Sequence, residues 1–170
     1  MPDRFYDFYN YPSWITEMWQ KYYDLALSYK KSINELLCHE ANSPENIYSE
    51  RNIFPILFLF RHYLELAFKS LILKQQSTIP THHKIKDLLS EVNRLNPNFQ
   101  LSKEAFDFID WIESHDNDSY SFRYPTDKKM NEHFTTITKA IAKGISLSYV
   151  STNISKISGE LEKYLQPPTF

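Results

Sequence analysis

The stretch from Ile53 to Leu73 constrains this chain most, because it is nearly all apolar and yet carries polar side chains at helical spacing. Around a helix turning about 100° per residue, Glu65 lies about 40° from Arg61 and Lys69 lies about 80° from it. His62 lies about 100° from Arg61 and borders the same sector. We expect such a helix to be buried on most sides, with this polar sector either touching water or lining a polar cleft.

A span through a lipid bilayer is the first alternative for so apolar a stretch. Charged groups near its middle would each cost about 2.5–3.5 kcal/mol in a membrane, so we predict a buried helix and no membrane partner. Two interpretations of the polar sector stay open. Arg61 and Glu65, at i and i+4, can form a solvent-facing stripe or an ion pair that fixes packing. Alternatively the sector binds an anion or does acid–base chemistry, with Arg61 stabilising charge and His62 carrying a proton.

The composition indicates one helical domain spanning residues 1–170. Aromatic residues make up 16% of the chain, enough bulky surface to argue against disorder, and only 2 glycines are present, fewer than all-β turns usually need. The net charge of −2 excludes a strongly basic nucleic-acid footprint. A single cysteine, Cys38, permits no internal disulfide and favours a cytoplasmic location; we predict that it is a small buried side chain.

Apolar spacing predicts the helices. They are expected over residues 13–41, from between 44 and 51 to 76, then over 84–96, 103–114 and 146–165. Pro55 either marks the first turn of the second helix or kinks it, and Ser102 is the expected N-cap of the fourth. The apolar face expected on the first helix comprises Ile15, Met18, Tyr22, Leu25, Tyr29 and Leu36, with Ile33 filling in. The last helix has the spacing of a seam, within the bundle or between two copies.

Two segments fall outside this pattern. Residues 1–12 form an aromatic N-terminal arm, and residues 115–144 form an irregular insert before the last helix. Within the insert, residues 120–124 are expected to be extended, and residues 133–141 form either a second short strand or a helical turn. The predicted fold class is therefore all-α, an up-down bundle of four to five helices with a short irregular or β-hairpin insert before the last helix.

Two further groups of residues could carry chemistry. The insert holds side chains that serve either turn chemistry or a binding site: Asp116, Asp118, Ser119, Arg123 and Tyr124. Thr81 is the expected N-cap of the third helix, and the adjacent His82 and His83 have a ligand or catalytic role as their alternative. Acidic residues that wind around the fourth helix, Glu104, Asp107, Asp110 and Glu113, are expected to be a solvated surface. Without a phosphate loop, a nucleophile elbow, paired cysteines or a dinucleotide fingerprint, we predict no cofactor and no metal.

Three segments in this order resemble bacterial proteins of the HEPN superfamily: FLFRHYLELAFKSLIL, THHKIKDLL and DNDSYSFRYPTD, with a long helix after them. The resemblance covers about residues 50–165. It implies a helical bundle that is often dimeric. It also implies a role in toxin–antitoxin, abortive-infection or other phage-defence systems, where many members are ribonucleases and others are non-catalytic.

The ribonuclease signature of that superfamily is an arginine followed, after about four to six residues, by a histidine on one helix. No arginine of this chain has a histidine at that distance, so the catalytic pair is not transferred; the adjacent Arg61 and His62 come nearest. A metal-independent ribonuclease needs a base for the 2′-hydroxyl proton and a cation for the phosphorane. Here His62 or His82 could be the base, and Arg61 or Arg123 the cation.

The predicted candidates are therefore catalytic residues Arg61, His62, Glu65 and Arg123, and binding residues Lys69, His82, Asp118 and Tyr124. Two functions stay open. The first is an effector or accessory protein of a prokaryotic defence or stress system, acting on RNA or a nucleotide. The second is a non-enzymatic bundle that acts as a homodimer or docks a cognate protein partner.

Overall fold

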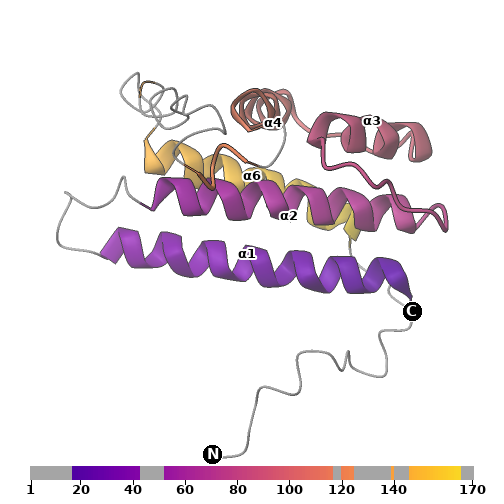
Figure 1. The fold of residues 1–170 in the computed structure, drawn as a ribbon, viewed down its shortest axis with the longest axis horizontal. Coiled ribbons are helices and arrows are strands. Elements are labelled where there is room, and N and C mark those ends of the chain that lie inside the picture. The colour runs from indigo at the N-terminus through magenta and orange to yellow at the C-terminus, as the bar shows by residue number, and fades with distance from the viewer. Residues whose placement is uncertain (1–16, 43–51, 117–119, 125–138, 140–145, 166–170) are drawn as a thin grey trace, which may run out of the picture.

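The computed structural model describes residues 17–42, 52–116, 120–124, 139 and 146–165. Its helices are α1 (Met18–Asn42), α2 (Ile53–Leu73), α3 (Ile85–Leu95), α4 (Lys103–His115) and α6 (Leu147–Leu165). In Figure 1, α1 and α2 lie side by side and run in opposite directions, α6 lies behind α2, and α3 and α4 lie across α2 from α1. Within the described residues the chain is all-helical between its turns and loops, so the all-α prediction is confirmed.

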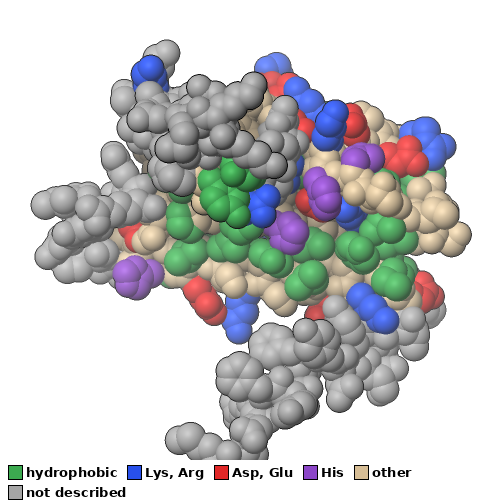
Figure 2. Space-filling model, in the orientation of Figure 1, with side chains coloured by type: hydrophobic (Ala, Val, Ile, Leu, Met, Phe, Trp, Pro, Cys, Tyr) green, Lys and Arg blue, Asp and Glu red, His purple; other side chains and the backbone are tan. Residues whose placement is uncertain are grey.

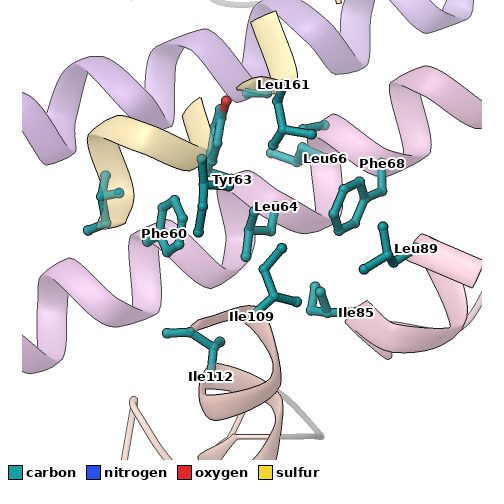
Figure 3. Close-up of a cluster of buried hydrophobic side chains, with 14 of the residues drawn as sticks. Phe60, Tyr63, Leu64, Leu66, Phe68, Ile85, Leu89, Ile109, Ile112 and Leu161 are labelled. Carbon is teal, nitrogen blue, oxygen red and sulfur yellow. The ribbon is translucent and has the colours of Figure 1, made fainter. Parts of the chain in front are cut away.

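Helix α2 is the centre of the bundle, because α1, α3 and α6 all pack against it. Fifteen of its 21 residues are buried, as the apolar pattern predicts. Figure 3 shows side chains of α2 meeting those of three other helices in one cluster: Phe60, Leu64, Phe68, Ile85, Leu89, Ile109, Ile112 and Leu161. Full burial of each such side chain stabilises the fold by about 1.5–3 kcal/mol. Among the described residues, no helix has the length and apolar character that a membrane span requires.

The helix ends follow from local chemistry in two cases and from tertiary contact in a third. Pro55 lies in the first turn of α2, where a backbone N–H has no helical partner, so it does not kink the helix. Ser102 caps α4, and its hydroxyl accepts the Ala105 N–H at 3.3 Å. The prediction that Thr81 caps the third helix is wrong: Lys84 holds the N-cap position of α3 without a side-chain bond.

The acceptor for the start of α3 comes instead from α4. The Glu113 carboxylate accepts the Ile85 N–H at 3.1 Å, and the Glu113 side chain is buried. The prediction of a solvated acidic surface is therefore wrong for Glu113, although Glu104, Asp107 and Asp110 are exposed. A carboxylate at a helix N-terminus also interacts favourably with the helix dipole. This contact fixes the N-terminus of α3 against α4.

Helix α1 turns only part of its predicted face to the core. Met18 and Leu25 are 55% and 41% exposed, whereas Trp19, Ala26 and Ile33, seven residues apart, are buried. The predicted face is thus wrong for Met18 and Leu25, whereas Ile33 is in the core, and Tyr22, Tyr29 and Leu36 pack against it. Ile15 lies outside the described residues. The prediction for Cys38 is also wrong, because this side chain is exposed.

The irregular insert contains a turn where an extended piece was predicted. The N–H groups of Arg123 and Tyr124 both donate to the Tyr120 carbonyl oxygen, at 3.1 and 3.2 Å. The described residues of the insert therefore contain no strand, and the β-hairpin is not supported. The N-terminal arm (1–12), Asp118, Ser119, residues 133–138 and residues 140–141 lie outside the described residues. The seam of the last helix faces the bundle, since Val150, Ile154, Ile157 and Leu161 are buried.

Candidate functional site

Arg61 is fully buried at the middle of α2, where its guanidinium ties three chain segments together. Its Nε donates to the Asp116 carbonyl oxygen at 2.6 Å, and its Nη2 donates to the His83 carbonyl oxygen at 2.8 Å. Asp116 ends α4, and His83 belongs to the segment that leads into α3. The planar fork of a guanidinium suits two acceptors that approach from different segments. Arg61 therefore positions backbone and has no exposed surface for a ligand.

Glu65 lies one turn further along α2 and is the hub of the charged cluster. Its Oε1 accepts hydrogen bonds from Lys69 Nζ at 2.9 Å and from His83 Nδ1 at 2.8 Å. Its Oε2 lies 3.7 Å from Arg61 Nη1 and 4.0 Å from His62 Nδ1. Burial raises the pKa of Glu65, but the hydrogen bonds from Lys69 and His83 lower it by more, so this pKa lies below its ordinary value. Glu65 is therefore ionised at neutral pH.

His62 and His83 form the exposed edge of this cluster, with side chains 30% and 63% exposed. Figure 2 shows histidines gathered with acidic and basic side chains over α2 and the segment before α3. Burial lowers the pKa of His62 more than the Glu65 charge raises it, so His62 is neutral at pH 7. An ionised carboxylate only accepts hydrogen bonds, so the Nδ1 atom of His83 that contacts Glu65 carries a hydrogen. The Nε2 atom lies on the other side of the ring and points away from Glu65.

The turn at residues 120–124 brings a second cation to this edge. The Asp116 Oδ1 accepts the Ser121 N–H at 2.6 Å, which anchors the turn at the end of α4. The Arg123 guanidinium then lies 5.6 Å from the centre of the Phe58 ring, within the range of a cation–π contact. The same Phe58 ring stacks with the His62 ring at 6.4 Å. Arg123 and His62 are thus neighbours through Phe58.

Five of the predicted candidates therefore come together: Arg61, His62, Glu65, Lys69 and Arg123. Three of them, Arg61, Glu65 and Lys69, are buried, so the polar sector of α2 is not a solvent-facing stripe. Tyr124 is 45% exposed beside Arg123, and Asp118 lies outside the described residues. His82 is exposed and takes part in no hydrogen bond or ion pair among the described residues.

Sequence reasoning chose His82 where the structure places His83 on Glu65, and it missed the Asp116 carbonyl oxygen as a partner of Arg61. Adjacent residues of an extended segment point in opposite directions, so one of two neighbouring histidines faces the bundle and the other faces water. That alternation is a usable signal, but which of the two faces inward depends on the register of the segment. Among the described residues, no group of three or more His, Cys, Asp or Glu side chains could hold a metal ion.

These observations define a class of protein: a helical bundle whose central helix carries a buried arginine, glutamate and lysine, with histidines at the exposed edge of this cluster. The family model described as the HEPN domain matches residues 45–149, and the chain belongs to this family. The matched residues include α2, α3, α4 and the start of α6, so they contain the whole charged cluster. No curated protein and no solved structure matches the chain.

Proposed function

We propose that this HEPN-domain protein cleaves RNA without a metal ion, as a cytoplasmic effector of a prokaryotic defence or stress system. One observation carries the proposal. His62 from α2 and His83 from the segment before α3 approach the two oxygens of one buried carboxylate, and the exposed Arg123 contacts the Phe58 ring that stacks with His62. Two imidazoles and an exposed cation can serve as the base, the acid and the charge stabiliser in metal-independent cleavage of a phosphodiester.

The chemistry assigns a proton to each imidazole in turn. Neutral His62 takes the proton of the 2′-hydroxyl as its oxygen attacks phosphorus. His83, protonated, gives a proton from Nε2 to the departing 5′-oxygen, so the products are a 2′,3′-cyclic phosphate and a 5′-hydroxyl. The guanidinium of Arg123 balances the charge that builds on the phosphorane oxygens. Water then opens the cyclic phosphate with the two histidines in exchanged roles, which returns each proton to its starting position.

Glu65, Arg61 and Lys69 act as positioning residues in this scheme. Glu65 holds the His83 imidazole through Nδ1 and balances its charge when it is protonated, as the carboxylate does in other carboxylate–histidine pairs. Arg61 fixes residue 83 through the backbone, because it binds the His83 carbonyl oxygen at 2.8 Å. Lys69 bonds the same Glu65 oxygen as His83 and keeps the carboxylate ionised.

The test is cleavage of a fluorescent single-stranded RNA by purified protein in excess EDTA. We expect first products that end in 2′,3′-cyclic phosphate and are then hydrolysed to 3′-phosphate. We expect His62→Ala, His83→Ala and Arg123→Ala each to lower kcat by about 10²-fold or more. His39→Ala is the matched control, because His39 is an exposed histidine of α1 outside the cluster, and it should cleave like the wild type.

Three results would contradict the proposal. They are no cleavage by the wild type, cleavage that EDTA abolishes, and cleavage that neither His62→Ala nor His83→Ala lowers. Loss of activity in His82→Ala with full activity in His83→Ala would show that the wrong histidine is assigned. Circular dichroism of each variant separates lost chemistry from lost fold.

A second candidate function is a homodimeric binding module, and one observation favours it. Met18 and Leu25, seven residues apart on α1, form an exposed apolar strip about 100° around the helix from the buried Trp19 and Ala26. The buried seam of α6 is occupied within the bundle, so this strip is the surface we propose for a second copy of the chain. Light scattering of the wild type beside Leu25→Glu tests it: we expect a dimer that the charge converts to a monomer. A monomeric wild type would exclude it and leave a cognate protein as the proposed partner.

A further inference from the structure

Tyr120, Arg123 and Tyr124 form an aromatic surface next to the histidine edge, and the cleavage scheme gives its rings no role. The Tyr124 ring lies 4.4 Å from the Tyr120 ring at an interplanar angle of 32°, and the Arg123 guanidinium lies 5.7 Å from the Tyr124 ring centre. Tyr124 nevertheless remains 45% exposed. Large aromatic side chains give most of their binding energy when they are covered. This ring is therefore available to stack with a planar ligand.

The turn that carries these rings is fixed before any ligand arrives. Phe122 is only 3% exposed and anchors the turn in the core. The Asp116 carboxylate accepts the Ser121 N–H, and the Tyr124 N–H bonds the Tyr120 carbonyl oxygen. A ring held on a rigid turn loses little conformational entropy on binding, so more of its contact energy appears as affinity.

The surface is continuous with the histidine edge through stacked neighbours. From His62 to Phe58, from Phe58 to Arg123 and from Arg123 to Tyr124 the separations are 6.4, 5.6 and 5.7 Å. Arg123 therefore lies between Tyr124 and Phe58, with its charge available to a phosphate. A continuous series of contacts thus joins the His62 imidazole to the Tyr124 ring.

We propose that the Tyr124 surface stacks with an unpaired base of single-stranded RNA, an inference that rests on the proposed action on RNA. A base inside a duplex has its faces covered by neighbouring bases, so only an unpaired base can stack with Tyr124. Recognition of duplex phosphates by charge alone would need many cations, and this chain has a net charge of −2. Stacking with the base supplies affinity that the charge does not, and it depends little on which base is present.

Binding can be measured apart from cleavage with a fluorescein-labelled 2′-O-methyl oligonucleotide, whose blocked 2′-oxygen cannot attack phosphorus. By fluorescence anisotropy we expect Tyr124→Ala to weaken binding of the single strand by about 5- to 100-fold, as for other base–aromatic stacks. Tyr124→Phe, which keeps the ring, should bind like the wild type. Tyr149→Ala is the matched control, since Tyr149 is a 47% exposed tyrosine on α6. The same strand annealed to its complement should bind weakly and show no difference between wild type and Tyr124→Ala.

Equal affinity of Tyr124→Ala and wild type for the single strand would overturn the inference, and so would equal affinity of the wild type for single strand and duplex. The two proposals fail separately. If binding depends on the Tyr124 ring but unmodified RNA is not cleaved, the stacking proposal stands and the proposed ribonuclease activity fails. If Tyr124→Ala cleaves RNA with an unchanged KM, the proposed ribonuclease activity stands and the stacking proposal fails. Circular dichroism of Tyr124→Ala should match the wild type, because the side chain is half exposed.

Discussion

Replacement of Arg61 should destabilise this protein more than almost any other single substitution, because its guanidinium serves backbone and charge together. It is fully buried, donates to two carbonyl oxygens and lies 3.7 Å from both the Glu65 and the Asp116 carboxylates. Arg61→Ala leaves those carbonyl oxygens without this donor and the two carboxylates without this cation. Breaking a buried charge pair from one side costs about 3–5 kcal/mol, and we expect that loss in the free energy of unfolding.

A graded series of substitutions at Arg61 separates the effect of its charge from the effect of its two-pronged guanidinium geometry. Arg61→Lys keeps the charge, but one ammonium cannot bond both carbonyl oxygens in the geometry of a guanidinium. Losing one hydrogen bond from a charged donor costs about 1.5–3 kcal/mol, so Arg61→Lys should fall between wild type and Arg61→Ala. Arg94→Ala is the matched control, because Arg94 pairs with Glu91 on the exposed face of α3 and such pairs contribute little.

Urea unfolding followed by circular dichroism measures these differences as shifts in midpoint at constant slope. Thermal unfolding should agree, since about 3–5 kcal/mol corresponds to a fall in Tm of about 6–20 °C for a chain of this size. Arg61→Ala within about 1 kcal/mol of the wild type would refute the reasoning, because the loss of two hydrogen bonds from a charged donor should alone cost more than that. Equal losses in Arg61→Lys and Arg61→Ala would show that geometry, not charge, sets the whole effect.

Three further predictions concern the groups around Arg61. Burial raises the pKa of Glu113 by more than the hydrogen bond from the Ile85 N–H and the Arg61 charge lower it. Glu113→Gln keeps an acceptor for that N–H, so its free energy of unfolding in urea at pH 7 should stay within about 1 kcal/mol of the wild type. Glu113→Ala loses the cap and should be less stable by about 1–2 kcal/mol. The lowered pKa of His62 means that the unfolded chain binds its proton first, so stability should fall as pH drops below about 6.5 and through the folded pKa, and this slope should be missing from His62→Ala. Glu65→Leu alone should cost about 3–5 kcal/mol because Lys69 stays buried and charged, while Glu65→Leu with Lys69→Met should recover most of that loss; a double variant no more stable than the single would deny the coupling.

The all-helical fold was largely predictable because the sequence of α2 is apolar on most sides of a helix. A helix with apolar residues on most sides has to be surrounded, and fifteen buried residues of 21 meet that expectation. The face of α1 was only partly predictable, since Met18 and Leu25 follow its apolar spacing and are nevertheless exposed. The fully buried residues of α1 include Ala26, whose small apolar area contributes little to any hydrophobic count.

The candidate site was predictable only as far as it lies on one helix. The pairing of Glu65 with Arg61 and Lys69 follows from i,i+4 spacing alone. His83 and the Asp116 carbonyl oxygen could not be found in this way. One lies in a segment without helical periodicity, and the other is a backbone group whose availability depends on where α4 ends. The residues that complete the site are thus set by tertiary structure.

The buried Arg61 on α2 supplies hydrogen-bond donors to backbone acceptors of two other chain segments. Residue 83 precedes α3 and residue 116 follows α4, so neither carbonyl oxygen has a partner within a helix, and both point toward the same side of α2. An apolar side chain at position 61 would remove the donor that these two carbonyl oxygens share. A long buried cation bonds both, and the Glu65 and Asp116 carboxylates, each 3.7 Å away, balance its charge. The bond that fixes the backbone of His83 also sets its imidazole against Glu65, so the same contact that completes the bundle positions the histidine edge.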